Sequence, residues 1–298
     1  MSEPSDFAST TRRRMPVAAL VGLTALVMVA FAANSVLARL TLVGTATGAG
    51  TFTFIRLLAG ALVLAAIVRV RSSHPAMRRL GGGWASALAL FVYAAAFSFA
   101  YLSLATGTGA LLLFGAVQLT MIGWGVGKGE RMKPMAWLGV ALAMGGLVWL
   151  LLPGVTAPPI GPALLMALSG IGWGAYSLVG RGSADPLADT AGNFLRAVPL
   201  GFGALIAAAL TSEMGASADW EGLGYAALSG GVTSGLGYAL WYAVLPSLRA
   251  ASAATVQLSV PVLAALGGVV FVAEPITLRL AVAACVTLGG IALVVRSR

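Results

Sequence analysis

Charged side chains are scarce in this chain of 298 residues. Only 9% of the residues are Asp, Glu, Lys or Arg, whereas soluble domains carry about 25%. Hydrophobic residues make up 59% of the chain and the mean hydropathy is +0.95. This composition excludes a soluble globular domain and predicts an all-α polytopic protein embedded in a bilayer.

Cysteine and histidine are almost absent. The one cysteine, Cys285, excludes an intramolecular disulfide, and we interpret it as a small packing residue of an apolar helix. The one histidine, His74, lies in a basic loop, so the sequence offers no cluster of metal ligands. We therefore expect no metal, no cofactor and no intramembrane enzyme.

The net charge of +9 raises the question of a nucleic-acid partner. The only basic runs are Arg12–Arg14 and Arg78–Arg79, which are too small to follow a phosphate backbone. A basic balance is also expected of a membrane protein whose cytoplasmic loops retain Lys and Arg. We expect membrane lipid and a small-molecule substrate as partners, and no nucleic acid.

Apolar stretches long enough to cross a hydrocarbon core of about 30 Å recur along the chain. They predict ten transmembrane helices at 15–38, 51–70, 82–105, 108–126, 134–152, 160–180, 190–211, 222–245, 250–272 and 277–295. Residues 1–14 form an N-terminal tail. The first apolar run is too long for the core of a cleaved signal peptide, so we interpret it as a retained span.

Lys and Arg counting gives the orientation. With the N-terminus inside, fourteen of the eighteen basic residues fall in inside segments and two fall outside. The two outside are Arg39 and Arg279, and two more lie within span ends. The sequence therefore predicts that both termini are cytoplasmic, in a bacterial-type inner membrane.

The chain repeats one helical pattern at offsets of 139 to 144 residues. Its paired features are Phe54-Ile55-Arg56 with Phe194-Leu195-Arg196, Ser35 and Arg39 with Ser177 and Arg181, Val117-Gln118-Leu119 with Val256-Gln257-Leu258, Gly129-Glu130 with Ala273-Glu274, and Gly145-Gly146 with Gly289-Gly290. The proline-rich segment 153–159 lies between the copies and is typical of a linker. Residues 15–152 form the first repeat and residues 160–296 the second.

Five spans per repeat decide the architecture. An odd number makes the second copy enter the membrane from the opposite side, so the two halves are inverted. Inverted repeats are typical of secondary transporters, whose binding site lies near the bilayer midplane between the halves.

The same residues carry a family resemblance. The duplicated Phe-x-Arg and Gly-Glu or Ala-Glu motifs, the Gly-Gly pairs and Pro261 resemble the drug/metabolite transporter superfamily, in its EamA-type ten-span class. Within that class the chain is most similar to bacterial exporters of aromatic amino acids. This resemblance implies the export of Phe, Tyr, Trp or related metabolites.

Carboxylates are absent from the predicted span centres. All nine lie in loops, in the tail or at span ends. A proton-coupled exchanger of cations normally needs a buried carboxylate that alternates between proton and substrate. The sequence therefore favours alternating access without a proton relay built into side chains, and it disfavours an exporter of cationic drugs or polyamines. A polytopic receptor or scaffold remains an alternative of another class, although neither needs two-sided symmetry.

Aromatic and amide side chains are the candidates for the substrate site, because they cluster within the predicted spans. An aromatic-lined pocket with little charge suits a planar, partly apolar ligand. The candidates are Asn34, Tyr93, Phe97, Tyr101, Gln118, Trp173, Tyr176, Tyr238, Trp241, Tyr242 and Gln257. Packing or an interfacial position is the alternative interpretation for each aromatic.

Four arginines and one proline are candidates for gating. Arg39 and Arg181 are repeat mates at opposite faces, and so are Arg56 and Arg196. Each arginine could bind substrate or backbone carbonyls, or extend to the membrane interface. Pro261 lies within a predicted span, where it removes a backbone hydrogen bond. We expect one chain to form the transport unit.

Overall fold

The computed structural model describes residues 15–71, 80–154, 157–212, 215–248 and 250–297. Every regular element in these ranges is helical, which confirms the all-α prediction. The elements are α1 (Val17–Gly44), α2 (Ala49–Arg71), α3 (Trp84–Ala100), α4 (Thr106–Gly127), α5 (Pro134–Leu151), α6 (Ile160–Val179), α7 (Pro186–Thr211), α8 (Trp220–Ala227), η2 (Leu228–Leu236), α9 (Gly237–Val244), η3 (Leu245–Ser247), α10 (Ala250–Gln257), α11 (Ser259–Val272) and α12 (Leu278–Ser297).

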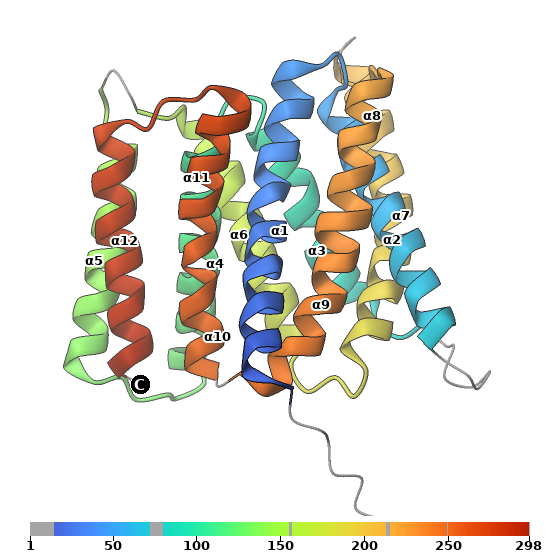
Figure 1. The fold of residues 1–298 in the computed structure, drawn as a ribbon. Helices are drawn as coiled ribbons and strands as arrows, with labels where there is room; N and C mark the ends of the chain where they lie inside the picture. Colours follow the sequence, from blue (N-terminus) through green and yellow to red (C-terminus); the bar gives the residue numbers. More distant parts are fainter. Residues whose placement is uncertain (1–14, 72–79, 155–156, 213–214, 249, 298) are drawn as a thin grey trace, which may run out of the picture.

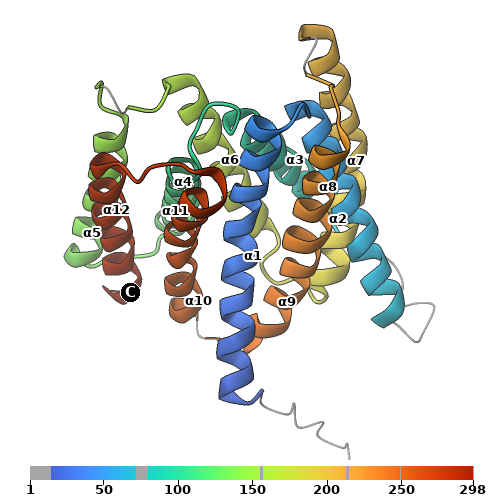
Figure 2. The same cartoon turned by 45° about the horizontal axis from the view of Figure 1, so that its top comes forward.

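The helices stand side by side across the molecule (Figures 1 and 2). Within the described ranges, eight helices are long and apolar enough to cross a membrane, and α3 is a shorter apolar helix. The eighth predicted span is a continuous run of α8, the π-helix η2 and α9. Each of the ten predicted spans thus coincides with one helix or with consecutive helical segments.

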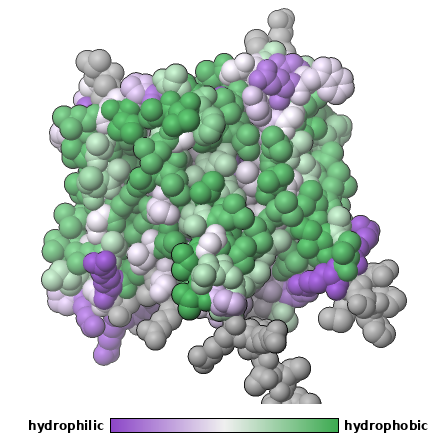
Figure 3. Space-filling view, viewed as in Figure 1, coloured by the Kyte–Doolittle hydropathy of each residue, from purple (hydrophilic) through white to green (hydrophobic). Residues whose placement is uncertain are grey.

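The surface agrees with a multi-pass membrane protein. Hydrophobic side chains cover the middle of the face seen in Figure 3, and hydrophilic ones gather near its two ends. Large apolar side chains such as Leu164, Phe202 and Val270 are exposed along the helices. In water such a surface would drive aggregation, whereas lipid chains accommodate it.

The helix boundaries differ most from the predicted spans at the ends of α1 and α3. Helix α1 continues to Gly44, six residues beyond the predicted end at residue 38, and α3 ends at Ala100 rather than at residue 105. Polar Arg39 and Thr41 lie in the added part of α1, where hydropathy alone indicates a span end. The helix continues there because protein groups bond both side chains: Arg39 donates to Glu274, and the Thr41 hydroxyl donates to the Leu37 carbonyl.

The helix contacts follow a two-fold pattern: when each helix is replaced by its predicted repeat mate, the same pairs of helices are in contact. Helix α2 packs on α7, α5 packs on α12 and α4 packs on α11, and each pair joins predicted repeat mates. The contact of α3 with α6 has its counterpart in that of α1 with η2. Inverted repeats would produce this pattern, although the repeat itself stays a prediction.

Glycines allow α5 and α12 to approach closely. A Cβ added at Gly290 would lie 2.5 Å from the carbonyl oxygen of Gly139, and one at Gly146 would lie 3.0 Å from that of Ala283. The helices are antiparallel, because residue numbers rise along α5 as they fall along α12. Small residues give membrane helices their packing energy by this close approach.

We expect Gly290→Ala to destabilise the protein, because its methyl group would collide with the Gly139 carbonyl. Overpacking of this kind costs about 1–3 kcal/mol. Gly289→Ala is the matched control, since nothing lies within 4 Å of its added Cβ. Thermal unfolding of the detergent-purified variants should show a lower midpoint for Gly290→Ala alone, and equal midpoints would contradict the packing role.

Asp219 joins two loops at the face opposite the start of α1. Its carboxylate accepts hydrogen bonds from Ala46 N at 2.9 Å, from the Thr47 hydroxyl at 2.8 Å and from Gly222 N at 2.9 Å, the last as the N-cap of α8. These bonds, the Ala46 amide first, hold the pKa of Asp219 below its usual value. The connection is present at neutral pH and is lost as the pH falls through that lowered pKa.

Candidate transport cavity

A cavity of about 560 Å³ lies among helices of both halves. Its volume is in the range of small-molecule sites. The wall consists of Phe31, Asn34, Ser35, Tyr93, Phe97, Leu113, Phe114, Val117, Gln118, Met121, Ile122, Trp173, Ser177, Arg181, Tyr238, Trp241, Leu245, Ala253, Ala254, Gln257, Val294 and Val295. These residues come from α1, α3, α4, α6, α9, η3, α10 and α12, with Arg181 just beyond the end of α6.

The cavity extends toward the face that carries the start of α1 and the end of α12. Ile122, Leu245 and Val294 lie near the ends of α4, α9 and α12 at that face, which is the lower one in Figure 1. At the other end, the wall stops at Ser35 and Phe97, before the ends of α1 and α3. The cavity is therefore one-sided in this structure.

Eight of the eleven predicted substrate residues line the cavity. They are Asn34, Tyr93, Phe97, Gln118, Trp173, Tyr238, Trp241 and Gln257. Arg181, one of the predicted gating residues, lines it as well.

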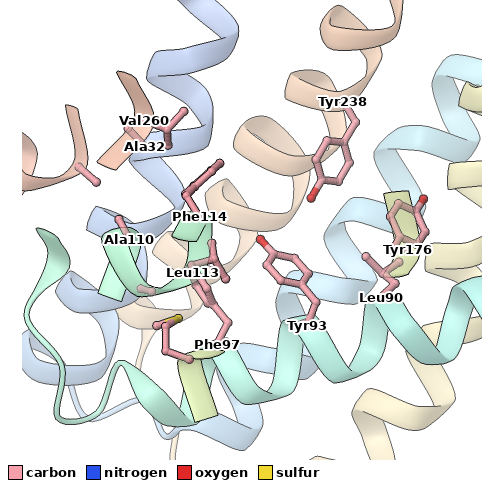
Figure 4. Close-up of a cluster of buried hydrophobic side chains, with 14 of the residues drawn as sticks. Ala32, Leu90, Tyr93, Phe97, Ala110, Leu113, Phe114, Tyr176, Tyr238 and Val260 are labelled. Atoms are coloured by element: carbon pink, nitrogen blue, oxygen red, sulfur yellow. The ribbon is translucent and has the colours of Figure 1, made fainter. Parts of the chain in front are cut away.

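Trp173 of α6 is the centre of the aromatic wall. Its ring stacks on Tyr238 at a centroid distance of 5.2 Å and on Tyr176 at 5.4 Å, and it meets Tyr93 at 5.1 Å. Phe31 of α1 makes an edge contact with Trp241 at 6.1 Å. Figure 4 shows the hydroxyl groups of Tyr93 on α3 and Tyr238 on α9 pointing toward one another. The wall thus offers ring faces together with phenolic hydroxyls.

Three predicted substrate residues lie behind the wall. The Tyr101 hydroxyl donates to the carbonyl oxygen of Thr106 at 3.2 Å. The hydroxyls of Tyr176 and Tyr242 each lie 3.0 Å from that of Thr190 on α7. Helical spacing grouped these tyrosines with the cavity residues in the prediction. In the structure their hydroxyls instead form hydrogen bonds that connect neighbouring helices.

Asn34 belongs to a polar cluster that sequence reasoning missed. Its Oδ1 faces the hydroxyls of Ser229 at 2.8 Å, Thr233 at 2.7 Å and Ser234 at 3.3 Å, all from the π-helix η2. A π-helix often marks a functional site, because the wider turn redirects side chains. The signal available in the sequence was the Ser-, Thr- and Gly-rich run Ser229–Gly237 within an apolar span.

Pro261 accounts for a break in the ninth predicted span. The span is divided into α10 and α11 at Leu258, whose N–H bonds to Thr255 at 3.1 Å. Pro261 has no N–H for the carbonyl of Gln257, four residues earlier, so the α-helical ladder stops there. This break places the end of α10, with Gln257, at the cavity wall.

The face opposite the cavity opening is closed by an ion pair between the two halves. Nε of Arg39 on α1 lies 2.8 Å from Oε1 of Glu274, which follows α11. The Arg39 guanidinium also donates to the carbonyl of Tyr101 at 2.8 Å, and Thr106 N donates to Oε2 of Glu274 at 2.7 Å. The two side chains are 13% and 14% exposed, so this network is largely shielded from solvent.

Glu130, the predicted repeat mate of Glu274, has a similar but not identical local geometry, because its N–H bonds five residues back and that of Glu274 bonds six residues back. Glu130 N donates to the carbonyl of Gly125 at 3.0 Å, as Glu274 N does to Gly268 at 3.1 Å. Each carboxylate also lies near the glycine to which its own N–H donates. Glu130 thus ends α4 at the open face as Glu274 ends α11 at the closed face.

The mates Arg56 and Arg196 have different surroundings. Arg196 Nη1 donates to the carbonyls of Gly81 at 2.7 Å and Gly192 at 2.9 Å, so it binds backbone near the start of α3. Arg56 is 2% exposed and donates to the Tyr93 hydroxyl at 2.6 Å, with its guanidinium over the Phe97 ring. The two arginines are therefore not equivalent in this structure.

Among the described residues, no three His, Cys, Asp or Glu side chains gather as a metal site.

The fold and the cavity define a polytopic membrane protein with an aromatic-lined binding site. Residues 161–296 match the EamA-like transporter family. The chain is 54% identical over 284 residues to "Uncharacterized protein PA1977" of Pseudomonas aeruginosa, covering 95% of this chain and 97% of that protein. A solved structure titled "Crystal structure of protein" superposes with a TM-score of 0.62 at 18% identity, covering 94% and 99% of the two chains, which shows a shared fold.

The match over residues 161–296 identifies a membrane transporter of EamA-like type, not an enzyme. The match supports the predicted drug/metabolite transporter superfamily.

Proposed function

We propose that this transporter exports small aromatic metabolites, such as aromatic amino acids and their analogues, by alternating access. The observation that carries this proposal is the one-sided cavity whose wall combines Trp173, Tyr238 and Trp241 with the amides of Asn34 and Gln118. Ring faces suit a planar apolar group, with offset contacts contributing about 0.5–1.5 kcal/mol each. The amides and phenols suit the polar end of such a molecule.

The conformational change rests on two inverted five-helix repeats, residues 15–152 and 160–296, in a ten-span chain. The exchange symmetry of the helix contacts supports this division, as does the antiparallel packing of mates α5 and α12. With both termini in the cytoplasm of a cell with a bacterial-type inner membrane, the cavity faces inward in this state. The cavity lies within one chain, so a monomer suffices as the transport unit.

The repeats also supply a mechanism for the exchange. In this state Arg39 and Glu274 close the outer face, and Arg181 lines the open cavity. Their repeat mates are Arg181 and Glu130, which again supply one positive and one negative side chain. Both lie toward the inner face, where Glu130 follows α4. We therefore infer that Arg181 and Glu130 pair when the inner face closes and the outer ion pair breaks. Each state then has one closing ion pair.

Neither proton relay nor cation exchange is built into the wall. Among the described lining residues there is no Asp or Glu, and Arg181 is charged. A cationic drug or polyamine would meet a positive side chain without a carboxylate, which disfavours that alternative. A scaffold would need no cavity, and a receptor without flux would need no ion pair that closes the face opposite its cavity.

Replacing Trp241 by Ala tests the substrate class. We expect aromatic substrates to bind roughly 2- to 12-fold more weakly, because one ring contact is lost. Small aliphatic amino acids should change less, since they contact less of the ring. Uptake into proteoliposomes measures both groups, with Trp149→Ala as the control because Trp149 is 47% exposed on α5, outside the wall. An equal loss for all substrates would contradict an aromatic site.

A further inference from the structure

Arg56 is a buried charge without a carboxylate partner. It is 2% exposed within α2, and no described Asp or Glu lies within ion-pair distance of it. One of its nitrogens, Nη1, is buried without a hydrogen-bond partner. A charge in the membrane-embedded part of a protein normally pairs with an opposite charge or marks a ligand pathway.

Aromatic rings take the place of the missing counter-ion. The guanidinium carbon lies 4.5 Å from the Phe97 ring centroid and 5.0 Å from that of Tyr93. Both rings line the cavity, so Arg56 lies directly behind this part of the wall. Cation–π contacts offset only part of the cost of burying a charge. The positive charge is therefore available to an anion in the cavity.

Tyr93 connects Arg56 to the cavity. Nη2 of Arg56 donates to the Tyr93 oxygen at 2.6 Å, so the phenolic proton must point to another acceptor. Within the described part of the chain that bond is the only one in which the Tyr93 hydroxyl takes part. A donor bonded to a cation becomes a stronger donor. Tyr93 thus presents a polarised O–H to whatever occupies the cavity.

Asn34 adds a second donor to the same wall. Three hydroxyls of η2 surround its Oδ1, which leaves the amide N–H₂ as the part of Asn34 that can reach the cavity. Farther along the wall, Arg181 adds a full positive charge. Arg181 is the one charged side chain among the described lining residues, so the charge of this wall is positive.

We propose that Tyr93, polarised by Arg56, and Asn34 form a subsite for the carboxylate of the substrate, so that the cavity prefers aromatic carboxylate anions to the corresponding amines. This inference rests on the proposed aromatic substrate class and makes it narrower. A zwitterionic amino acid can use the same subsite through its carboxylate. An aromatic acid without an ammonium group binds at least as well, because the described wall has no carboxylate for that ammonium.

Four ligands that share one ring and differ in charge test the subsite: 3-phenylpropionate, L-phenylalanine, 3-phenylpropionamide and phenethylamine. Calorimetric titration of the purified protein in lipid nanodiscs should rank the anion and the zwitterion above the neutral amide, with the amine last. Equal affinity for the acid and its amide would overturn the proposal.

Tyr93→Phe keeps the ring and removes the donor. We expect 3-phenylpropionate to bind about 12- to 150-fold more weakly, the range for a hydrogen bond to a charged group, and the amide to change little. Tyr176→Phe is the matched control, because its hydroxyl bonds Thr190 outside the wall. Arg56→Gln should also lose the preference for the anion over the amide. Tyr93→Phe is the primary test, because it disturbs folding less than the replacement of a buried arginine.

The outcomes separate the two proposals. If Tyr93→Phe weakens acid and amide equally, the carboxylate subsite is wrong while the aromatic cavity stands. If none of the four ligands binds the wild type, the aromatic substrate class fails and the subsite falls with it.

Discussion

Replacing Glu274 by Gln is expected to open the closed face of this transporter, which is the outer face in the proposed orientation. The change keeps an acceptor for Thr106 N but removes the charge that holds Arg39. The pair is partly shielded, so its loss should shift the ratio of the two states by about 1–3 kcal/mol, or about 5- to 150-fold. Arg39→Gln should act in the same direction.

Cysteine accessibility measures this shift. In a background with Cys285 replaced by Ser, Ser35→Cys places a thiol at the cavity wall, next to the closed end. A membrane-impermeant thiol reagent added outside should label it slowly in the parent and faster in the Glu274→Gln variant. Arg279→Gln is the control, because Arg279 bonds to the Leu152 carbonyl at the same face, away from the pair.

A double-mutant cycle isolates the ion pair. If Arg39 and Glu274 act through each other, the double variant should open the outer face no further than either single variant. Additive effects would show two independent contributions and contradict a closing pair. Unchanged labelling in all variants would mean that packing alone closes this face.

Replacing Glu130 or Arg181 by Gln is expected to have the opposite effect. In the proposed inverted repeat these residues are the mates of Glu274 and Arg39 at the inner face, and we infer that they pair when this face closes. Without the pair the protein should remain open inward, and transport should fall by about 5- to 150-fold. Ser35→Cys should then be labelled from outside more slowly than in the parent.

The repeat mate of Ser35 gives the reciprocal readout. Ser177→Cys lies on the cavity wall toward the inner face, and its labelling from inside should stay high in Glu130→Gln. Lys128→Gln is a suitable control, because Lys128 lies over the Trp124 ring at the same face. Normal transport by both Glu130→Gln and Arg181→Gln would contradict the mirrored gate.

Hydropathy and repetition predicted most of the fold, because a bilayer requires long apolar helices. They predicted ten spans, each of which coincides with one helix or with consecutive helical segments, and the clustering of aromatic and amide side chains predicted eight of the cavity residues. They could not predict that Tyr101, Tyr176 and Tyr242 lie behind the wall. Helical spacing shows which residues share one face of a helix, but it does not show which other helix that face contacts. Thr106 and Thr190, which bind these hydroxyls, come from other helices.

Contacts between the two halves could not be predicted from the sequence either, because they depend on how distant helices pack. The sequence marked Arg39 and Glu274 as duplicated residues, 235 positions apart, but only the folded chain brings them to 2.8 Å. Arg56 and Arg196 looked equivalent in the sequence. They differ because Tyr93 lies beside one, and the loop carbonyl of Gly81 beside the other.

The most direct test of the account is flux through the purified protein. Proteoliposomes loaded with unlabelled phenylalanine should accumulate labelled phenylalanine by counterflow, with no pH gradient and in the presence of an uncoupler. The account predicts this exchange, because the described cavity wall holds no carboxylate to carry a proton and alternating access needs only substrate. Absence of counterflow for every aromatic substrate, or strict dependence on a proton gradient, would contradict it.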